Sequence, residues 1–507
     1  MKHALPIMQS SWFAFAGMLF CGCHLGPKNG IPAPKDGGSS PDSVMVECGG
    51  LCSIGQLCCE EVCVEAASCD FAVIGADPSV GWHNGGNYVT LKGSGFTAGM
   101  KVFIGDARAP VLVKSATAAR IQLPPGPLGK QDIRIELGAD QATLPRGILY
   151  QSGGLNNQWE QKPLMKVRGE NPGVTTLQDG RVLVAGGVEV PDQPKTALNT
   201  AELYHHNLNM VSPAKNTMST VRWQNAVVTL LDGRALVMGG ACWPSENDCT
   251  GDLASADLFD PTTDTFKPTH KPLNKKRVYV RAVLLVDGRV LLSSANDPSL
   301  EVFDPATDEF TLLPHPMPHD LGFMVRLRDG RVLLGGGDGG NTKADLFDPD
   351  TLKASPTAGK MQVGRAVLTA HTLPDGRVLL IGGTDKSAMA ISTSQKSLEI
   401  FDPNTNSFSP LGYSLTTARS WHASALVRDG TVLVMGGYSL DGCAATEKVE
   451  QIDPVAGKVL SFSSLKKPNT EFNAVTLLDG SVLAVGGGAC LDDLAKPDLD
   501  FLSGGPG

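Results

Sequence analysis

The stretch Ala226-Val-Val-Thr-Leu-Leu-Asp-Gly-Arg-Ala-Leu-Val-Met238 decides the fold, because it sets an Asp-Gly pair between two short apolar runs. An Asp-Gly pair between β-rich runs is a strong hairpin signal, and the two-residue form predicts a type I′ turn with positive φ at both central residues. The pattern recurs through the second two thirds of the chain. Its seven occurrences are Asp179-Gly180-Arg181, Asp232-Gly233-Arg234, Asp287-Gly288-Arg289, Asp329-Gly330-Arg331, Asp375-Gly376-Arg377, Asp429-Gly430-Thr431 and Asp479-Gly480-Ser481.

The hairpins start 42 to 55 residues apart, which is the period of β-propeller blades and too long for ankyrin or leucine-rich repeats. Paired small residues follow each second strand, Ser293-Ser294 in the third unit and Gly-Gly in the others. A third strand then ends in a Phe-Asp-Pro signature, as in Leu258–Phe266, where aspartate and proline favour a turn. We therefore expect four strands in each unit.

The Asp-Gly hairpin, the Gly-Gly pair and the Phe-Asp-Pro turn together resemble the kelch repeat family over residues 151–507. The resemblance implies a β-propeller, most simply with seven blades. The last unit lacks a fourth strand of its own, and Gln158–Leu164, ahead of the first hairpin, is expected to supply it. Such closure would remove exposed sheet edges.

The side-chain pattern of residues 71–150 alternates as in the strands of a small β-sandwich. The segment also contains Gly85-Gly86, Gly93-Ser-Gly-Phe96 and Gly99–Gly105. Their order resembles the IPT/TIG immunoglobulin-like domain, which does not by itself name a function. The predicted fold class is therefore all-β, with a seven-bladed kelch-type propeller preceded by an immunoglobulin-like sandwich and a small disulfide-rich module.

The N-terminus reads as an export signal over residues 1–23, because the apolar stretch from Ile7 to Phe20 is too short to span a bilayer. Cys23 follows Gly22 and precedes a Gly/Pro/Ser-rich linker over residues 24–47, which resembles a bacterial lipoprotein cleavage site and its tether. Ordinary cleavage and full secretion is the alternative. We expect an exported protein, held at the outer membrane or cell surface by lipid or otherwise secreted.

Six cysteines crowd residues 48–70, and this density in an exported chain predicts a disulfide-stapled module. Six cysteines allow 15 pairings, so the connectivity stays open, and a metal cluster is the alternative. Further along, Cys242 and Cys249 are close enough to staple one loop, and Cys443 and Cys490 are expected to join the last two blades. The six crowded cysteines are Cys48, Cys52, Cys58, Cys59, Cys63 and Cys69.

The formal charge of −9 and the pI near 5.6 argue against nucleic acid or anionic lipid as the main partner. A lipid on Cys23 would be the only membrane contact. The expected partner is a protein or glycan at the cell surface.

Strand order places the Asp-Gly and Phe-Asp-Pro turns on one face of the propeller, which we call the turn face. Turn chemistry explains the Asp-Gly-Arg residues there, although a ring of five arginines could also bind acidic groups. The opposite, loop face carries the variable loops, where binding usually resides. The candidate binding residues on the loop face are Trp223, Trp243, Tyr279, Trp421 and His422.

The segment Arg419–Ser424 resembles the copper-binding Tyr-His segment of galactose oxidase-like propeller enzymes. Here Trp421 stands at the tyrosine position, and the chain carries its sandwich before the propeller, whereas those enzymes take a histidine from a domain after it. Neither Val280 beside Tyr279 nor the position of Tyr204-His205-His206 restores the ligand set. We therefore predict no metal, cofactor or catalytic residue.

These observations predict a non-enzymatic, exported or surface-anchored kelch protein that binds a protein or carbohydrate through its loop face. A copper-dependent oxidase and a purely architectural envelope protein are the alternatives.

Replacement of Cys23 tests the anchor. We expect Cys23→Ser to move the protein from the membrane fraction to the soluble fraction and to remove the lipid mass from the N-terminal peptide. Cys21→Ser is the matched control and should stay membrane-bound. Wild-type protein that is released without lipid would contradict the prediction.

Overall fold

The computed structural model describes residues 56–59, 62–162, 169, 171–189, 196–243, 251–316, 319–386, 394–438, 445–488 and 499–504. Within them the all-β prediction is confirmed, because strands β1 to β41 are joined by loops and one short 3-10 turn, η1 (His206–Leu208). No helix of this described part is long and apolar enough to cross a membrane. Residues 46–507 form one compact unit.

Two sheets form the N-terminal sandwich. The first has the order β1-β2-β11-β10-β6-β7, with β4 beside β11, and the second has the order β3-β5-β9-β8. Val89, Leu91, Ile121 and Ile133 belong to the core between them and are fully buried. The strands are β1 (Leu57–Cys59), β2 (Val62–Ala66), β3 (Ala72–Asp77), β4 (Val80–Trp82), β5 (Tyr88–Ser94), β6 (Lys101–Ile104), β7 (Ala107–Ala109), β8 (Val111–Ser115), β9 (Ala118–Gln122), β10 (Gly129–Leu137) and β11 (Asp140–Gln151).

The described part of the cysteine-rich segment is a hairpin that extends the sandwich. Strand β2 pairs with β11, setting Ala66 opposite Ala142, so the segment gains a core by joining an existing sheet. A disulfide joins Cys59 to Cys69, and Cys63 is also disulfide-bonded. Cys48, Cys52, Cys249, Cys443, Cys490 and the lipidation candidate Cys23 lie outside the described residues. The expectation of disulfides in this segment is thus confirmed for three of its cysteines.

Seven four-stranded sheets follow among the described residues, and we number them blade 1 to blade 7 along the chain. Their innermost strands β13, β19, β23, β27, β31, β35 and β39 contact one another in sequence, and β39 contacts β13, so they enclose a central channel. Each Asp-Gly pair joins the first two strands of one blade. The loop between the second and third strands of blade 1 also holds a short hairpin, β15 (Val188–Glu189) with β16 (Thr196–Ala197).

The bounds of blades 1 to 4 are β13 (Gly173–Thr176), β14 (Val182–Ala185), β17 (Ala201–His205), β18 (Met210–Pro213); β19 (Ala226–Thr229), β20 (Ala235–Met238), β21 (Ala256–Asp260), β22 (Thr265–Pro268); β23 (Arg281–Leu284), β24 (Val290–Ser293), β25 (Ser299–Asp304), β26 (Glu309–Pro316); and β27 (Phe323–Arg326), β28 (Val332–Gly335), β29 (Ala344–Asp348), β30 (Lys353–Pro356). Those of blades 5 to 7 are β31 (Thr369–Thr372), β32 (Val378–Ile381), β33 (Gln395–Asp402), β34 (Ser407–Arg419); β35 (Ala423–Leu426), β36 (Val432–Met435), β37 (Val449–Asp453), β38 (Lys458–Phe462); and β39 (Asn473–Thr476), β40 (Val482–Val485), β41 (Leu499–Gly504), with β12 (Leu155–Lys162).

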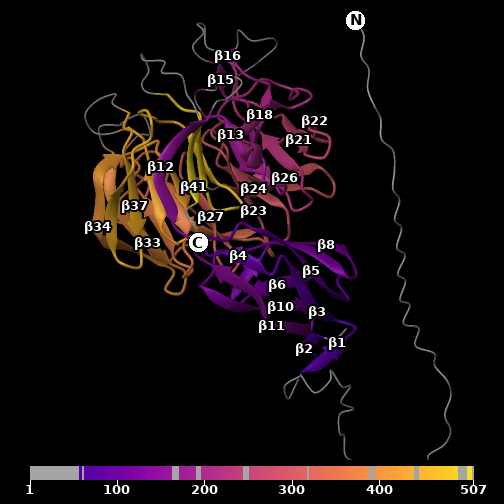
Figure 1. Cartoon of the computed structure of the whole chain (residues 1–507). Coiled ribbons are helices and arrows are strands. Elements are labelled where there is room, and N and C mark those ends of the chain that lie inside the picture. Colours follow the sequence, from indigo (N-terminus) through magenta and orange to yellow (C-terminus); the bar gives the residue numbers. More distant parts are fainter. Residues whose placement is uncertain are drawn as a thin grey trace, which may run out of the picture. The chain divides into compact units, whose positions relative to one another are not determined.

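The expected closure of the ring is confirmed. Strand β12 pairs antiparallel with β41, so the outermost strand of blade 7 comes from before blade 1 (Figure 1). Trp159 lies opposite Leu502 and is buried in the blade 6–blade 7 core. The paired strand ends at Lys162, and positions 163 and 164 of the predicted segment lie outside the described residues.

The predicted turn type is wrong, although the hairpins themselves are confirmed. In blade 2, Leu230 N donates to Arg234 O at 2.8 Å and Gly233 N donates to Leu230 O at 3.2 Å. Only Gly233 has positive φ, at 102°, and none of the seven turn aspartates does. This is a three-residue connection in which a type I turn is followed by a left-handed glycine.

In this longer turn the aspartate side chain accepts hydrogen bonds from the arginine that follows the glycine. Asp232 accepts hydrogen bonds from the backbone N and the Nε of Arg234 at 3.0 and 2.8 Å. The same guanidinium donates across to the Phe-Asp-Pro turn of blade 3, reaching Asp308 Oδ1 at 3.0 Å and Pro305 O at 2.8 Å. The turn arginines therefore help to join neighbouring blades.

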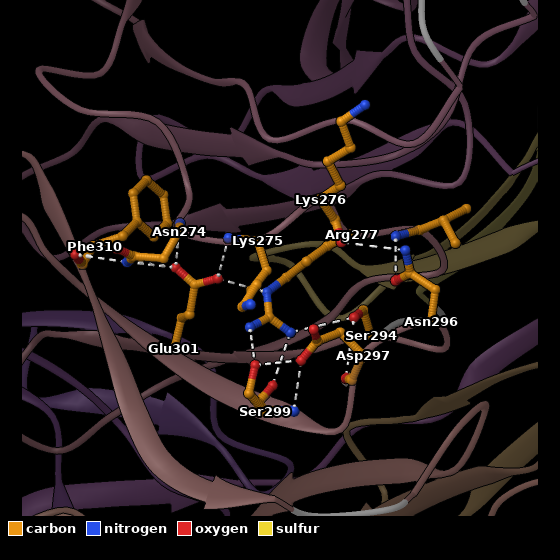
Figure 2. A network of polar contacts seen from close by, with 11 residues as sticks. Asn274, Lys275, Lys276, Arg277, Ser294, Asn296, Asp297, Ser299, Glu301 and Phe310 are labelled. Carbon is orange, nitrogen blue, oxygen red and sulfur yellow. Dashed lines mark hydrogen bonds and ion pairs between the residues drawn. The ribbon is translucent and has the colours of Figure 1, made fainter.

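A buried ion pair lies inside four blades and was missed in the sequence. Arg277, just ahead of β23, donates from Nε to Glu301 Oε1 at 2.8 Å, and both side chains are fully buried (Figure 2). Its remaining donors reach Ser294 Oγ and both oxygens of Ser299. The equivalent pairs are Arg222–Asp257, Arg365–Glu399 and Arg419–Glu450, with His319–Asp345 in blade 4.

The backbone of each buried arginine binds the preceding blade. Gly240 N of blade 2 donates to Arg277 O at 2.8 Å, and a Cβ on Gly239 would lie 2.8 Å from the same oxygen. Both glycines have positive φ. The Gly-Gly pair is thus required by its left-handed backbone and by the close approach of the neighbouring blade.

The sandwich contacts the turn face. Val111 N donates to Val286 O at 3.0 Å, and Trp82 Nε1 donates to Leu478 O at 2.7 Å. Arg108 forms a two-pronged ion pair with Asp350, and Tyr88 packs into the core shared by blades 2 and 3. The turn face is therefore partly occupied by the protein itself, whereas the loop face is at the other end of the channel.

Breaking one buried pair tests its structural role. Glu301→Leu leaves the Arg277 guanidinium buried without a counter-charge, so we expect the free energy of unfolding to fall by about 3–5 kcal/mol in denaturant titrations. The double variant Arg277→Met/Glu301→Leu should recover part of that loss, because it removes the uncompensated charge. Arg331→Ala, in a solvent-exposed turn pair, is the control and should cost at most about 1 kcal/mol. A single variant that costs no more than the control would contradict this role.

Candidate binding site at the channel mouth

Seven residues with left-handed backbone surround the loop-face end of the channel, which we call the mouth. Each lies two positions ahead of an innermost strand, and the set includes the β-branched Val367, for which positive φ is a true outlier. The φ values are Asn171 45°, Gln224 57°, Tyr279 50°, Leu321 57°, Val367 46°, Trp421 54° and Glu471 54°. Strained backbone of this kind clusters at functional sites.

Backbone hydrogen bonds link members of this ring from blade to blade. Asn171 N donates to Glu471 O at 2.9 Å, Gln224 N donates to Asn171 O at 3.1 Å, and Glu471 N donates to Trp421 O at 3.1 Å. Val367 N likewise donates to Leu321 O at 2.9 Å. The strain is thus held by neighbouring blades, which fixes the directions of the side chains at the mouth.

Tyr279 and Trp421, two of the predicted residues, meet at the mouth. Their ring centroids lie 5.4 Å apart with the planes inclined by 53°. Because Tyr279 precedes blade 3 and Trp421 precedes blade 6, the pair spans the channel. Both rings line a cavity of about 240 Å³, and Tyr279 also lines an adjoining cavity of about 210 Å³. We call these two spaces the mouth cavities.

Trp223 and Trp243 form a separate aromatic pair. Their rings are stacked 5.0 Å apart, with the planes inclined by only 7°. They pack beside Cys242, which is disulfide-bonded as expected, and neither lines the mouth cavities. The predicted aromatic residues therefore divide into an axial pair and an outer pair.

His422 faces the mouth but is buried, with 5% of its surface exposed. Its Nε2 lies 3.0 Å from Thr369 Oγ1, while its Nδ1 has no hydrogen-bond partner. Burial, with Arg419 and His371 adding repulsion, lowers the pKa of His422 to about 3. Burial likewise lowers the pKa of His371, whose Nε2 contacts Ser424 Oγ at 2.6 Å, to about 4. Both imidazoles are therefore neutral at physiological pH.

Sequence reasoning missed Arg281, the first residue of β23. Within the described part of the chain its one side-chain hydrogen bond runs from Nε to Gly322 O at 3.4 Å, and Arg281 lines both mouth cavities. Enclosure by the channel wall lowers its pKa. The sequence contained a signal for Arg281, because it is a charged residue at the start of an innermost strand. The other innermost strands begin with uncharged residues, namely Gly173, Ala226, Phe323, Thr369, Ala423 and Asn473.

Gln224 and Asn225 add unsatisfied amides beside Arg281. Gln224 is 4% exposed and Asn225 is 7% exposed. Among the described residues, Nε2 of Gln224 and both amide atoms of Asn225 have no hydrogen-bond partner. Both residues line the smaller mouth cavity. Buried amides without protein partners indicate a place for water or a ligand.

A larger chamber of about 480 Å³ lies at the turn-face end of the channel, bounded by innermost strands and by sandwich residues such as Gln122. Arg326 lines it and donates to Leu284 O at 2.5 Å and to Gln122 Oε1 at 3.5 Å. Burial lowers the pKa of Arg326 to about 10. His371 and Ser424 line this chamber as well as the mouth, so the two spaces share a wall.

The mouth does not fit a copper centre. Within the described residues no three His, Cys, Asp or Glu side chains gather closely enough to hold a metal ion. Indole is not a usual copper ligand, and the Nε2 atoms of His422 and His371 face hydroxyl groups. Two aromatic rings, a cation and amides line the mouth cavities.

Comparison with known proteins supports the fold. Residues 73–151 match the family model of the IPT/TIG domain, and residues 366–413 match that of the Kelch motif. A solved structure of a fungal alcohol oxidase of the AA5 family, in complex with copper, is similar with a TM-score of 0.54. It is 18% identical, and the match covers 70% of this chain and 77% of that chain, so it shows the fold alone. No curated protein sequence matches.

The chain thus carries an IPT/TIG domain followed by a kelch-type β-propeller, as both resemblances predicted. The distant likeness to a galactose oxidase-type propeller is also found, at the level of the fold.

The buried histidines predict a pH dependence of stability. His422 titrates near 6.5 when unfolded but near 3 when folded, so unfolding takes up a proton in between. The contribution of His422 to the free energy of unfolding is therefore complete above pH 6.5 and is lost as the pH falls toward 3. His422→Gln should flatten the fall in unfolding free energy between pH 6 and 4 by up to about 1.4 kcal/mol per pH unit. The exposed His270→Gln is the control, and equal slopes in all three proteins would contradict the assignment.

Proposed function

We propose that this is a non-enzymatic carbohydrate-binding protein of the cell surface, which binds a glycan at the mouth of its propeller. The observation that carries the proposal is the Tyr279–Trp421 pair, which lines a concave cavity next to unsatisfied polar groups. Concave sites with a few converging polar groups are typical of small-ligand recognition.

The chemistry of the two rings suits a sugar. A pyranose ring has an apolar C–H face and a rim of hydroxyl groups. Tyr and Trp offer broad apolar ring faces with a polar tip, while Gln224 and Asn225 offer amides to hydroxyls. A protein partner would bury on the order of 800 Å² of this chain's surface. The mouth cavities, of about 240 and 210 Å³, suit a group of the size of a sugar residue.

The export signal and the tether give the proposal its location. Lipid on Cys23 would hold the chain at the membrane, and the 24–47 linker would let the propeller reach glycans outside the cell. The partly covered turn face leaves the loop face as the binding surface in this arrangement.

Loss of the axial aromatic rings tests the proposal. We expect a screen of surface polysaccharide fragments to yield a saturable ligand, and Tyr279→Ala or Trp421→Ala to weaken its binding at least tenfold in titration calorimetry. This corresponds to about 1.4 kcal/mol, a modest value for a central aromatic contact. Trp223→Ala and Trp243→Ala remove the same chemistry from the outer pair and serve as matched controls, with circular dichroism to confirm folding.

Three outcomes would contradict this function. Stoichiometric copper with hydrogen peroxide formed from alcohols or aldehydes would establish the oxidase alternative, which the shared fold motivates. Absence of any saturable glycan, with co-purification in a fixed assembly, would favour an architectural role. Binding that depends on Trp223 and Trp243 but not on Tyr279 would place the site elsewhere.

A further inference from the structure

We propose that the mouth selects an acidic glycan, and that Arg281 binds a singly charged oxyanion on the sugar, a uronic acid carboxylate or a sulfate ester. This inference rests on the proposed function and deepens it, because it assigns the ligand's charge. The sequence analysis had placed possible binding of acidic groups at the Asp-Gly-Arg arginines of the opposite face.

Arg281 differs from the two repeated arginine sets of the propeller in lacking an acid, a property that it shares among the described residues with Arg326 in the turn-face chamber. The four buried arginines each hold a carboxylate within 3.0 Å, and each Asp-Gly-Arg arginine is paired with the aspartate of its own turn. Arg281 instead has one long bond to a carbonyl and no carboxylate partner in the part of the chain that the structure describes. A cation enclosed without a counter-charge is costly, and an incoming anion would offset that cost.

The neighbours of Arg281 can bind the rest of such a group. Asn225, with both amide atoms unpartnered, and Gln224, with an unpartnered Nε2, line the smaller mouth cavity together with the guanidinium. Amide N–H groups can donate to an oxyanion, and the Asn225 carbonyl can accept from a sugar hydroxyl. The planar guanidinium also presents paired N–H groups that match two oxygens of a carboxylate.

The charge around the cavity favours a monoanion. His371 and His422 are neutral because burial lowers their pKa values, so among the described residues Arg281 is the one cation that lines the mouth cavities. Glu471 also lines the larger cavity, and its Oε2 accepts from Asn171 Nδ2 at 3.1 Å. One cation beside a carboxylate would balance a single negative charge better than a phosphate dianion.

Adjacent parts of one site would bind the sugar ring and its acidic group. Tyr279 lines both mouth cavities with Arg281, and Trp421 lies across the larger one. A sugar held against the two rings would therefore place a ring substituent within the space that the guanidinium faces. Arg281 would act as the specificity-determining residue, and the rings would provide most of the contact area.

The experiment compares three probes on the full-length protein: trigalacturonate, a sulfated galactan trisaccharide and the neutral galactan trisaccharide. Titration calorimetry is done at low and high salt with wild type, Arg281→Gln and Arg281→Lys. We expect wild type to bind an acidic probe at least tenfold more tightly than the neutral one, with the preference reduced at high salt. Arg281→Gln should abolish the preference, while Arg281→Lys should keep part of it. The stronger of the two acidic probes identifies the oxyanion.

Arg331→Gln, which removes a turn-face arginine, is the matched control and should bind like wild type. Equal affinity for acidic and neutral probes, or a preference that survives in Arg281→Gln, would overturn the role of Arg281 and leave the glycan-binding function standing. A preference lost in Arg331→Gln would move the anion site to the turn face. Failure of every probe and of the wider glycan screen would overturn the function and the inference together.

Discussion

A buried guanidinium–carboxylate pair links strands within four blades and, through the arginine backbone, joins each of them to the blade before it. In Arg277 the side chain binds the third strand of its own blade through Glu301, while the backbone carbonyl binds the Gly-Gly segment of the blade before it. One residue thus sets both the internal register of a blade and its position against its neighbour. Since removing one partner would leave a charge in a dry interior, such a pair tolerates little displacement.

The buried arginine pairs also constrain the geometry of the mouth. Four of the seven left-handed residues lie two positions after a buried arginine, as Gln224 follows Arg222, Tyr279 follows Arg277 and Trp421 follows Arg419. The fixed arginine therefore constrains the strained residue, and neighbouring blades supply hydrogen bonds that hold it. Arg281 differs from the four repeated arginines, because it lines a cavity and no carboxylate partner lies within the described residues.

The sequence predicted those features that local chemistry determines. Asp-Gly between apolar runs marks a hairpin, Phe-Asp-Pro marks a turn in which Asp304 accepts Ala306 N at 2.9 Å, and the missing fourth strand pointed to residues near Trp159. The predicted turn type was wrong because two-residue and three-residue connections share the Asp-Gly pair. Only the backbone conformation distinguishes the two connections.

Features that depend on contacts between distant residues were not predicted. The buried arginines lie 17 residues ahead of a glycine or serine that they bind, a spacing that repeats in Arg222, Arg277, Arg365 and Arg419. This spacing could be recognised in the sequence, but the neighbouring residues do not distinguish a buried arginine from an exposed one. The division of the aromatic residues into two pairs, and the missing partner of Arg281, follow from the closure of the ring and could be found only in three dimensions.

We propose that this protein binds its glycan at the axial mouth, with Arg281 at the wall of the site. A crystal structure of the protein soaked with trigalacturonate would locate the sugar. We expect electron density for a sugar against Tyr279 and Trp421, with a carboxylate within hydrogen-bond distance of the Arg281 guanidinium. Sugar density at the Trp223–Trp243 pair or on the turn face, with the mouth holding only water, would contradict it.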